Sequence, residues 1–124
     1  MMAGLVALAP MGAMAQDADA GQRVFNQCRA CHTINQGGRS GVGPNLFGIL
    51  GRPAASIEGF RYSTPMRERA AAGLVWSEEN LLAYIADPKA LVPGGSMSYV
   101  GLRNEQQRAD LMAYILRAST APAN

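Results

Sequence analysis

Five consecutive residues constrain this chain more than any other feature. Cys28, Cys31 and His32 form an uninterrupted Cys-x-x-Cys-His sequence, and His32 is the only histidine in the chain. Two thiols at this spacing on a helical turn can each add across a vinyl group of a porphyrin, while the adjoining imidazole faces the iron. The motif therefore predicts one covalently attached haem c, a large flat cofactor that supplies part of the core of the fold.

Other uses of these residues fit the sequence less well. A thioredoxin-like dithiol needs a βαβ setting that is absent here, and it has no use for the histidine. A structural zinc site needs four ligands, and no further Cys or His follows His32. A disulfide between Cys28 and Cys31 stays open as an alternative in an exported protein, although so small a loop would add little stability.

Length and charge limit the classes of protein to consider. The chain has 124 residues, of which 48% are hydrophobic and 16% charged, which is typical of one small globular domain. A net charge of +2 is too small to indicate nucleic-acid binding, and aromatic and basic residues do not interleave as such a surface requires. We expect a monomer that does not bind nucleic acid.

Residues 1–15 are uncharged, apolar and rich in small side chains, and they end in an Ala-x-Ala pattern before Gln16. This composition is typical of a signal peptide with its cleavage site at that point. A membrane anchor is the alternative, but the segment falls short of the roughly 18–20 apolar residues that a spanning helix needs. No Lys or Arg precedes the apolar run, so the start of the leader is expected to be truncated. We expect export to the periplasm and a single domain at residues 16–124.

Apolar periodicity and capping residues predict an all-α fold of about four helices with long loops. The expected helices are Asp19 to about Cys31, residues 65–72 after a Thr64 cap, Ser77 to Pro88, and a last helix that begins with the capping pair Asn104 and Gln107. Residues 33–61 hold seven of the 14 glycines, a density that excludes long helices or regular strands. The first and last helices are expected to pack together.

A six-coordinate iron would need a second ligand besides His32, and a methionine thioether is the usual one in an electron carrier. Met97 follows Pro-Gly-Gly-Ser in a loop, where flexible backbone can bring a side chain against the open haem face. Met112 lies in the apolar stripe of the last helix and is expected in the core. Met66 begins a helix without special context. From loop position alone, a Met97 that fills a hydrophobic gap under the loop is about as well supported as a Met97 that binds the iron.

An ordered set of residues resembles the class I cytochromes c of the mitochondrial-like bacterial kind. After the Cys-x-x-Cys-His sequence come Gly43-Pro44-Asn45-Leu46, Gly51-Arg52, Phe60-Arg61-Tyr62, Trp76, Tyr84 and Pro93-Gly94-Gly95-Ser96-Met97. The resemblance spans about residues 19–119. It extends to Gly21 and Phe25 on the first helix and to Leu111 and Tyr114 on the last, which look like the helix-crossing contacts of the family. It implies the small all-α cytochrome c fold wrapped around one covalently bound haem.

The resemblance also implies roles for single residues. His32 would be the proximal iron ligand and Met97 the distal one, and the Pro44 carbonyl would accept a hydrogen bond from the outer ring nitrogen of His32. Tyr84 would place its hydroxyl near the Met97 sulfur. The residues that resemble those receiving the inner haem propionate are Arg52, Tyr62 and Trp76.

The sequence departs from the family pattern in four places. The segment between Tyr62 and Trp76 is longer than in the mitochondrial proteins, so the residue that tunes the buried water there is not assigned. Gly95 stands where a hydroxyl side chain often helps to bind propionate. Tyr99 replaces the common phenylalanine at the haem edge, and lysines are nearly absent.

The resulting prediction is an exported one-electron carrier and not an enzyme. Its partners would be redox proteins of a respiratory or photosynthetic chain that dock briefly: a membrane quinol-oxidising complex, a terminal oxidase, a photosynthetic reaction centre or a dehydrogenase. The alternative is a peroxidase-like or gas-binding haem protein in which Met97 is displaced. The cations that the resemblance places near the haem edge are Arg29, Arg39, Lys89 and Arg103, and they either steer an acidic partner or are simply scattered solvated charges.

Overall fold

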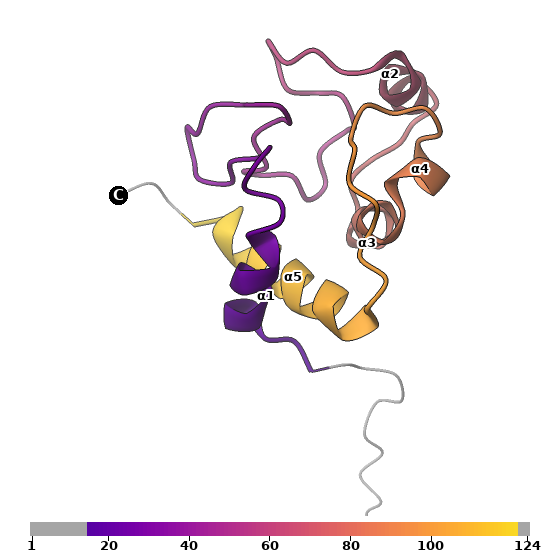
Figure 1. Ribbon diagram of the computed structural model, residues 1–124. Helices are drawn as coiled ribbons and strands as arrows, with labels where there is room; N and C mark the ends of the chain where they lie inside the picture. Colours follow the sequence, from indigo (N-terminus) through magenta and orange to yellow (C-terminus); the bar gives the residue numbers. More distant parts are fainter. Residues whose placement is uncertain (1–14, 122–124) are drawn as a thin grey trace, which may run out of the picture.

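The computed structural model describes residues 15–121, and within them it contains five α-helices and no strand (Figure 1). The helices are α1 Ala18–Phe25, α2 Thr64–Ala71, α3 Glu78–Ala86, α4 Pro88–Leu91 and α5 Glu105–Ala118. This confirms the expected all-α class. The only ladder-like contact in the described chain is an isolated β-bridge between Pro53 and Val75. None of the described helices is long and apolar enough to cross a bilayer.

The first helix is shorter than expected. Asp17 caps α1 by accepting from the N–H groups of Asp19 and Ala20, and the helix ends at Phe25 instead of near Cys31. The backbone continues in tight turns, in which Cys28 N–H donates to the Phe25 carbonyl at 2.8 Å and His32 N–H donates to the Cys28 carbonyl at 2.9 Å. The apolar spacing of this segment suits both conformations, so periodicity alone does not separate a helix from consecutive turns.

Two of the three predicted caps are confirmed and one is wrong. Ser77 accepts from Asn80 N–H at 3.1 Å to begin α3, and Asn104 accepts from Gln107 N–H at 2.9 Å to begin α5. The cap of α2 is Ser63 instead of Thr64. Serine and threonine both carry a hydroxyl that can cap a helix. Thr64, next to Pro65, already belongs to the helix, so Ser63 takes the extended conformation of the cap.

The short helix α4 was not expected. Pro88 ends α3 as predicted, but it also occupies the first position of α4, where its missing N–H costs nothing. Asp87 caps this helix by accepting from Ala90 N–H at 3.3 Å. A proline that stops one helix can therefore begin the next one.

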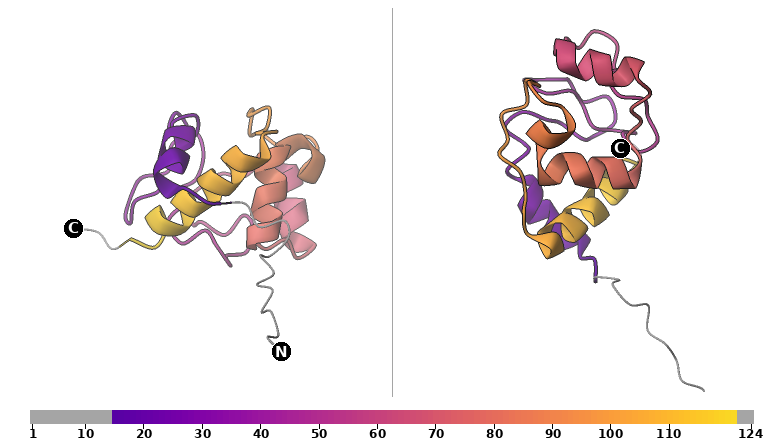
Figure 2. Two further views of the ribbon diagram at one scale, coloured as in Figure 1. Left: turned by 90° about the horizontal axis from the view of Figure 1, so that it is seen from below. Right: turned by 90° about the vertical axis from the view of Figure 1, so that its right-hand side faces the viewer.

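The expected packing of the first helix on the last is confirmed, and α1 crosses α5 in the views of Figures 1 and 2. Gly21 permits this approach, because a Cβ there would collide with the backbone carbonyl of Asp110. Next to this contact the Phe25 and Tyr114 rings lie 5.2 Å apart between centroids. The carboxylate of Asp110, which is buried, accepts from the N–H of Asp17 at 3.0 Å, so the start of α1 is also bound to α5.

The long segment before α2 and the segment between α4 and α5 complete the domain. Residues 33–61 form turns and irregular backbone, as their glycine density predicts. Figure 1 shows these loops on one side and the helices α3 and α4 on the other, above the crossed pair α1 and α5. The predicted leader at residues 1–15 lies outside the described residues, apart from Ala15.

Candidate functional site

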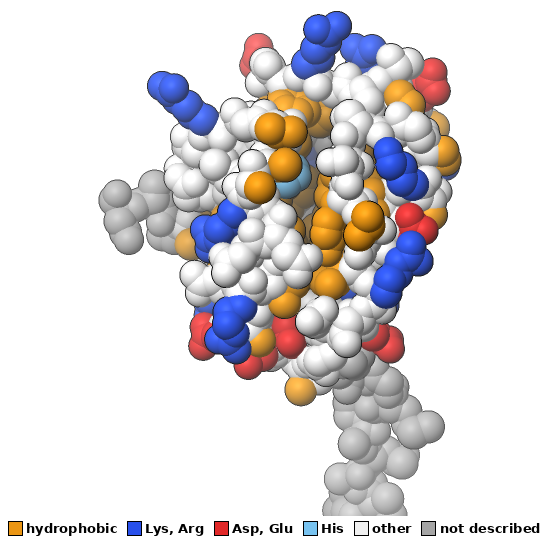
Figure 3. All heavy atoms as spheres, in the orientation of Figure 1, with side chains coloured by type: hydrophobic (Ala, Val, Ile, Leu, Met, Phe, Trp, Pro, Cys, Tyr) orange, Lys and Arg blue, Asp and Glu red, His pale blue; other side chains and the backbone are white. Residues whose placement is uncertain are grey.

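A hollow opens between the two sides of the domain, and we call it the crevice. Figure 3 shows an apolar cleft in which the single histidine is visible from outside. Its walls come from the turns after α1, the long loop, α3, the segment after α4, and α5. The structure brings all nine predicted site residues to this one crevice: Cys28, Cys31, His32, Pro44, Arg52, Tyr62, Trp76, Tyr84 and Met97.

The two cysteines of the motif are free and half-buried on one wall of the crevice. Burial, and next the charge of the Cys31 thiolate, raise the pKa of the Cys28 thiol to about 11. Dithiol oxidoreductases have an attacking thiol whose pKa is lowered, because the thiolate is the reactive form. The Cys28 thiol is instead protonated at neutral pH, which argues against a thioredoxin-like use of this pair.

His32 is held in one orientation by the backbone. Its Nδ1 lies 2.7 Å from the Pro44 carbonyl oxygen, which can only accept, so Nδ1 carries the proton and donates. Burial lowers the pKa of His32, and the bond to Pro44 partly opposes this effect. The neutral ring therefore leaves Nε2 with a free lone pair, as a metal ligand requires.

Gly43 leaves room for this ring. A Cβ at residue 43 would collide with His32 Cε1 and would lie 2.7 Å from both Nδ1 and Nε2. Real Cβ atoms essentially never make contacts this short. The glycine next to Pro44 is thus required by the close approach of the imidazole to the backbone.

Two methionines reach the crevice. Met97, in the segment after α4, and Met66, in the first turn of α2, are both half-buried and line the crevice. Sequence reasoning did not single out Met66, since nothing in its context marks it beyond the start of a helix. The segment of Met97 is joined to the turns that carry the motif, because Tyr99 two residues later donates its hydroxyl to Gln27 Oε1 at 3.0 Å, and Gln27 precedes Cys28.

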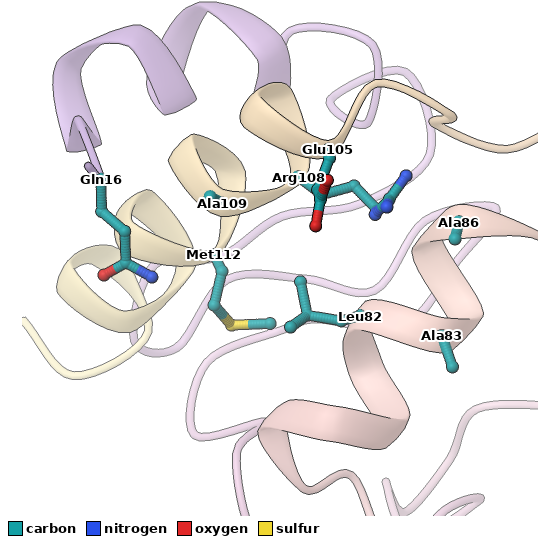
Figure 4. Close-up of a pocket in the computed structure, with 8 residues that line it drawn as sticks. All are labelled: Gln16, Leu82, Ala83, Ala86, Glu105, Arg108, Ala109 and Met112. Carbon is teal, nitrogen blue, oxygen red and sulfur yellow. The ribbon is translucent and has the colours of Figure 1, made fainter. Parts of the chain in front are cut away.

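Met112 lies elsewhere, as predicted. It is fully buried under a second recess between α3 and α5, where its side chain lies against Leu82 (Figure 4). The recess is lined mostly by small and apolar side chains, with Glu105 and Arg108 also along it. Met112 is therefore a core residue and does not reach the crevice.

The polar groups of the crevice gather around one guanidinium. Arg52 donates from Nη1 to the Phe47 carbonyl at 2.9 Å and from Nη2 to the Asn45 carbonyl at 3.3 Å. The Tyr62 hydroxyl accepts from Ile57 N–H at 3.1 Å. Burial lowers the pKa of Arg52, and nearby Tyr62 opposes this effect. A fixed cation beside a phenol suits a carboxylate that enters an apolar crevice.

Aromatic rings form much of the remaining wall. The Trp76 and Tyr84 rings lie 5.0 Å apart between centroids at 49°, and Phe60 meets Tyr62 edge-on at 4.8 Å. Burial raises the pKa of Tyr84 to about 12, so its hydroxyl stays neutral and can donate. Sequence reasoning quoted Phe60 only as part of a pattern and missed Gln27, although both line the crevice.

The residues present fit a haem c. Two thiols beside an imidazole provide covalent attachment and one axial ligand, and the apolar and aromatic walls suit a porphyrin face. A thioether supplies the type of second ligand found in electron carriers, and the Arg52 guanidinium suits a propionate.

Comparisons with known proteins agree with this geometry. The family model described as Cytochrome c matches residues 18–119. The chain is 47% identical over 103 residues to the cytochrome c2 of Blastochloris viridis, which covers 83% of this chain and 79% of that protein. It is 46% identical over 95 residues to the cytochrome c-550 of Ancylobacter novellus, covering 77% and 89%. It is 45% identical over 101 residues to the cytochrome c2 of Rhodoblastus acidophilus, covering 82% and 92%.

These relatives are electron-transfer cytochromes and not enzymes, which favours the predicted carrier over the peroxidase-like or gas-binding alternative. The chain belongs to the class I cytochromes c, and it is a one-electron carrier with one covalently attached haem c.

Proposed function

We propose that His32 and Met97 are the axial ligands of this carrier and that it transfers electrons in the periplasm. The observation that carries the proposal is the crevice itself, where an imidazole with a free Nε2 and the thioether of the Met97 segment line the same cavity as both thiols. The bound haem supplies the one-electron chemistry between Fe(II) and Fe(III). The protein sets the ligands, the surrounding dielectric and the access of solvent.

His32 binds through Nε2 because its other nitrogen is committed to Pro44. The 2.7 Å bond from Nδ1–H to that carbonyl fixes the tautomer and makes the ring a better donor to a metal. Gly43 allows the backbone to approach the ring at this point. Thioether ligation by Met97 would favour the ferrous state and raise the reduction potential.

Arg52, Tyr62 and Trp76 are proposed to hold the inner propionate, and Tyr84 to place its hydroxyl near the Met97 sulfur. In support, Arg52 is fixed by two backbone carbonyls, and the Trp76 and Tyr84 rings pack together in the crevice wall. A buried carboxylate needs such donors, because burial of an unpaired charge is costly.

Location and partners are proposed from the leader and from the relatives. The pattern of residues 1–15 supports export and cleavage before Gln16. The proposed partners are redox proteins that exchange single electrons with such a carrier: a membrane quinol-oxidising complex, a terminal oxidase, a photosynthetic reaction centre or a dehydrogenase. Each would dock briefly at the open edge of the crevice, where electrons leave by the shortest path.

Charge steering of these partners is proposed to be weak. Arg103 pairs with Asp87 at 3.2 Å, and Lys89 donates to the Gly95 carbonyl at 2.8 Å. Arg29 stacks on the Phe25 ring and donates to the Tyr114 hydroxyl at 3.3 Å. Only Arg103 is thus neutralised by an acid, since the partners of Lys89 and Arg29 are neutral groups, and the side chain of Arg39 has no contact of this kind within the described part of the chain. Weak steering is proposed from this pairing and from the small net charge of +2.

An absorption spectrum tests the ligand proposal directly. Protein is purified from a host that attaches haem, and spectra are recorded in the ferric state, in the ferrous state, and after carbon monoxide is added. We expect low-spin ferrous bands, a ferric thioether-to-iron charge-transfer band and no carbon monoxide complex. A high-spin spectrum or prompt binding of carbon monoxide would refute the His32 and Met97 pair.

A further inference from the structure

The segment that carries Met97 has few bonds to the rest of the protein. Gly95 N–H donates to the Val92 carbonyl at 3.0 Å, and Leu102 N–H donates to the Ile85 carbonyl at 2.9 Å. Residues 96–101 lie between these two anchors. Within residues 15–121, the one hydrogen bond that these six residues make is from the Tyr99 hydroxyl to Gln27.

Glycines with positive φ lie two residues before this segment and at its last position. Gly94 has φ 78° and Gly101 has φ 112°, conformations that other residues rarely adopt. The segment is therefore a short span flanked by glycines. Met97 and Tyr99 pack against the core, and the Tyr99 hydroxyl makes the one hydrogen bond of the span within the described residues. A span of this kind can move as a unit when that hydrogen bond breaks.

The hydrogen bond from Tyr99 to Gln27 crosses the opening of the crevice. Gln27 belongs to the turns after α1 and is bonded there through its own N–H to the Val24 carbonyl at 3.1 Å. Both Gln27 and Tyr99 line the crevice, one from the wall that carries the cysteines and the other from the wall that carries Met97. The two residues are 72 positions apart, so the bond connects two segments that are distant in the sequence.

We propose that the hydrogen bond from Tyr99 to Gln27 is a latch that slows the departure of Met97 from the iron. The inference rests on the proposed function, because it requires Met97 to be an axial ligand. Tyr99 and Gln27 are positioning residues that do not contact the metal. They act by holding residues 96–101 against the wall of the crevice that bears the attachment motif.

The size of the effect follows from the environment of the bond. Departure of Met97 with its segment requires the bond to break, so the bond stabilises the closed state alone. Gln27 is exposed and water can replace Tyr99 as its donor, so the net strength is that of an ordinary protein hydrogen bond. Such a bond changes an opening equilibrium by about three- to tenfold.

Three variants and one control test the latch. Tyr99→Phe keeps the ring and removes the donor, Gln27→Met keeps the length and removes the acceptor, and the third variant combines both. Tyr114→Phe is the control, because its hydroxyl bonds Arg29 at 3.3 Å and lies outside residues 96–101. The haem-loaded ferric proteins are mixed with saturating imidazole, where the rate of complex formation is limited by the departure of Met97.

We expect both single variants to take up imidazole about three- to tenfold faster than the unmodified protein, and the double variant to match them, because one shared bond is lost in each case. The control should stay within about twofold, which is below the smallest effect of losing an ordinary hydrogen bond in the latch. Unchanged rates in the single variants, or multiplied effects in the double variant, would overturn the latch.

A failure of the underlying function would look different. The unmodified ferric protein would then lack the thioether-to-iron band and would bind imidazole at once, and the latch would be refuted together with the Met97 ligand. If the band is present in all proteins and only the rates fail to change, the ligand proposal stands and the latch alone is refuted.

Discussion

Substitution of Gly43 by alanine should damage the site through one contact with His32. The φ of Gly43 is not in the left-handed region, so alanine fits the backbone and the only cost is steric. The new Cβ would lie 2.7 Å from Nδ1 and Nε2 of the ring, where a comfortable contact needs about 3.4 Å or more. The imidazole or the loop would have to move by about 0.7 Å or more to relieve this overlap.

Such a movement stretches the bond from His32 to Pro44 beyond its useful range. The bond is now 2.7 Å, and an added 0.7 Å brings it to about 3.4 Å, where a hydrogen bond contributes little. Loss of that bond together with the overpacking should lower the free energy of unfolding by about 1–3 kcal/mol. A ring without its fixed tautomer is also a weaker donor, so the ferrous and ferric spectra should change.

Gly41→Ala is the matched control in the same loop. A Cβ there would lie 3.4 Å from the Cys31 carbonyl oxygen, an ordinary contact, and its φ is also outside the left-handed region. Denaturant unfolding of the haem-loaded proteins, followed by absorbance, gives the two free energies. The reasoning is refuted if Gly43→Ala unfolds within about 0.5 kcal/mol of the Gly41→Ala protein and keeps an unchanged spectrum.

Three further outcomes are expected. Met97→Leu should abolish the ferric thioether-to-iron band and allow carbon monoxide to bind, whereas Met66→Leu should keep the band; the reverse pattern would assign the ligand to Met66. Because the folded pKa of Tyr84 is about 12, above its ordinary value of 10, the unfolded state loses this proton first. The free energy of unfolding should therefore fall from pH 10 to 12 by at most about 1.4 kcal/mol per pH unit, and Tyr84→Phe should lack this component in the same titration. The rate of electron transfer to an acidic redox partner should change by less than about threefold as salt rises, since Arg103 is paired with Asp87 and the net charge is only +2, and a steep decrease would restore charge steering.

Local chemistry made most of the fold predictable. A serine or an asparagine before a run of good helix formers marks the start of α3 and of α5, because the side chain accepts an otherwise unpaired N–H. Gly21 and Phe25 were expected on a helix-crossing face, and the structure has both against α5. The end of α1 at Phe25 was not predictable, because the consecutive tight turns that follow and a helix share the same short-range spacing.

The site was predictable where one residue type has one chemical use. The cysteines and the sole histidine could be assigned from their spacing, and the structure gives His32 the expected carbonyl partner in Pro44. Met66 was considered only as a weak candidate and Gln27 was missed, both for a physical reason. Their positions in the crevice depend on where α2 and the turns after α1 are packed, which is information about tertiary structure that no local pattern contains.

A substitution at the rim of the crevice can alter the retention of Met97 without altering the fold. The resemblance to the family leads us to expect a phenylalanine at the position of Tyr99, and the hydroxyl of Tyr99 bonds Gln27, which is exposed. A change at the rim removes no hydrogen bond of the crossed helices, because Gly21 and Asp110 are buried and neither is bonded to Tyr99 or Gln27. The latch variants should therefore change the ligand kinetics while the unfolding free energy falls by no more than the net strength of one ordinary hydrogen bond, about 0.5–1.5 kcal/mol.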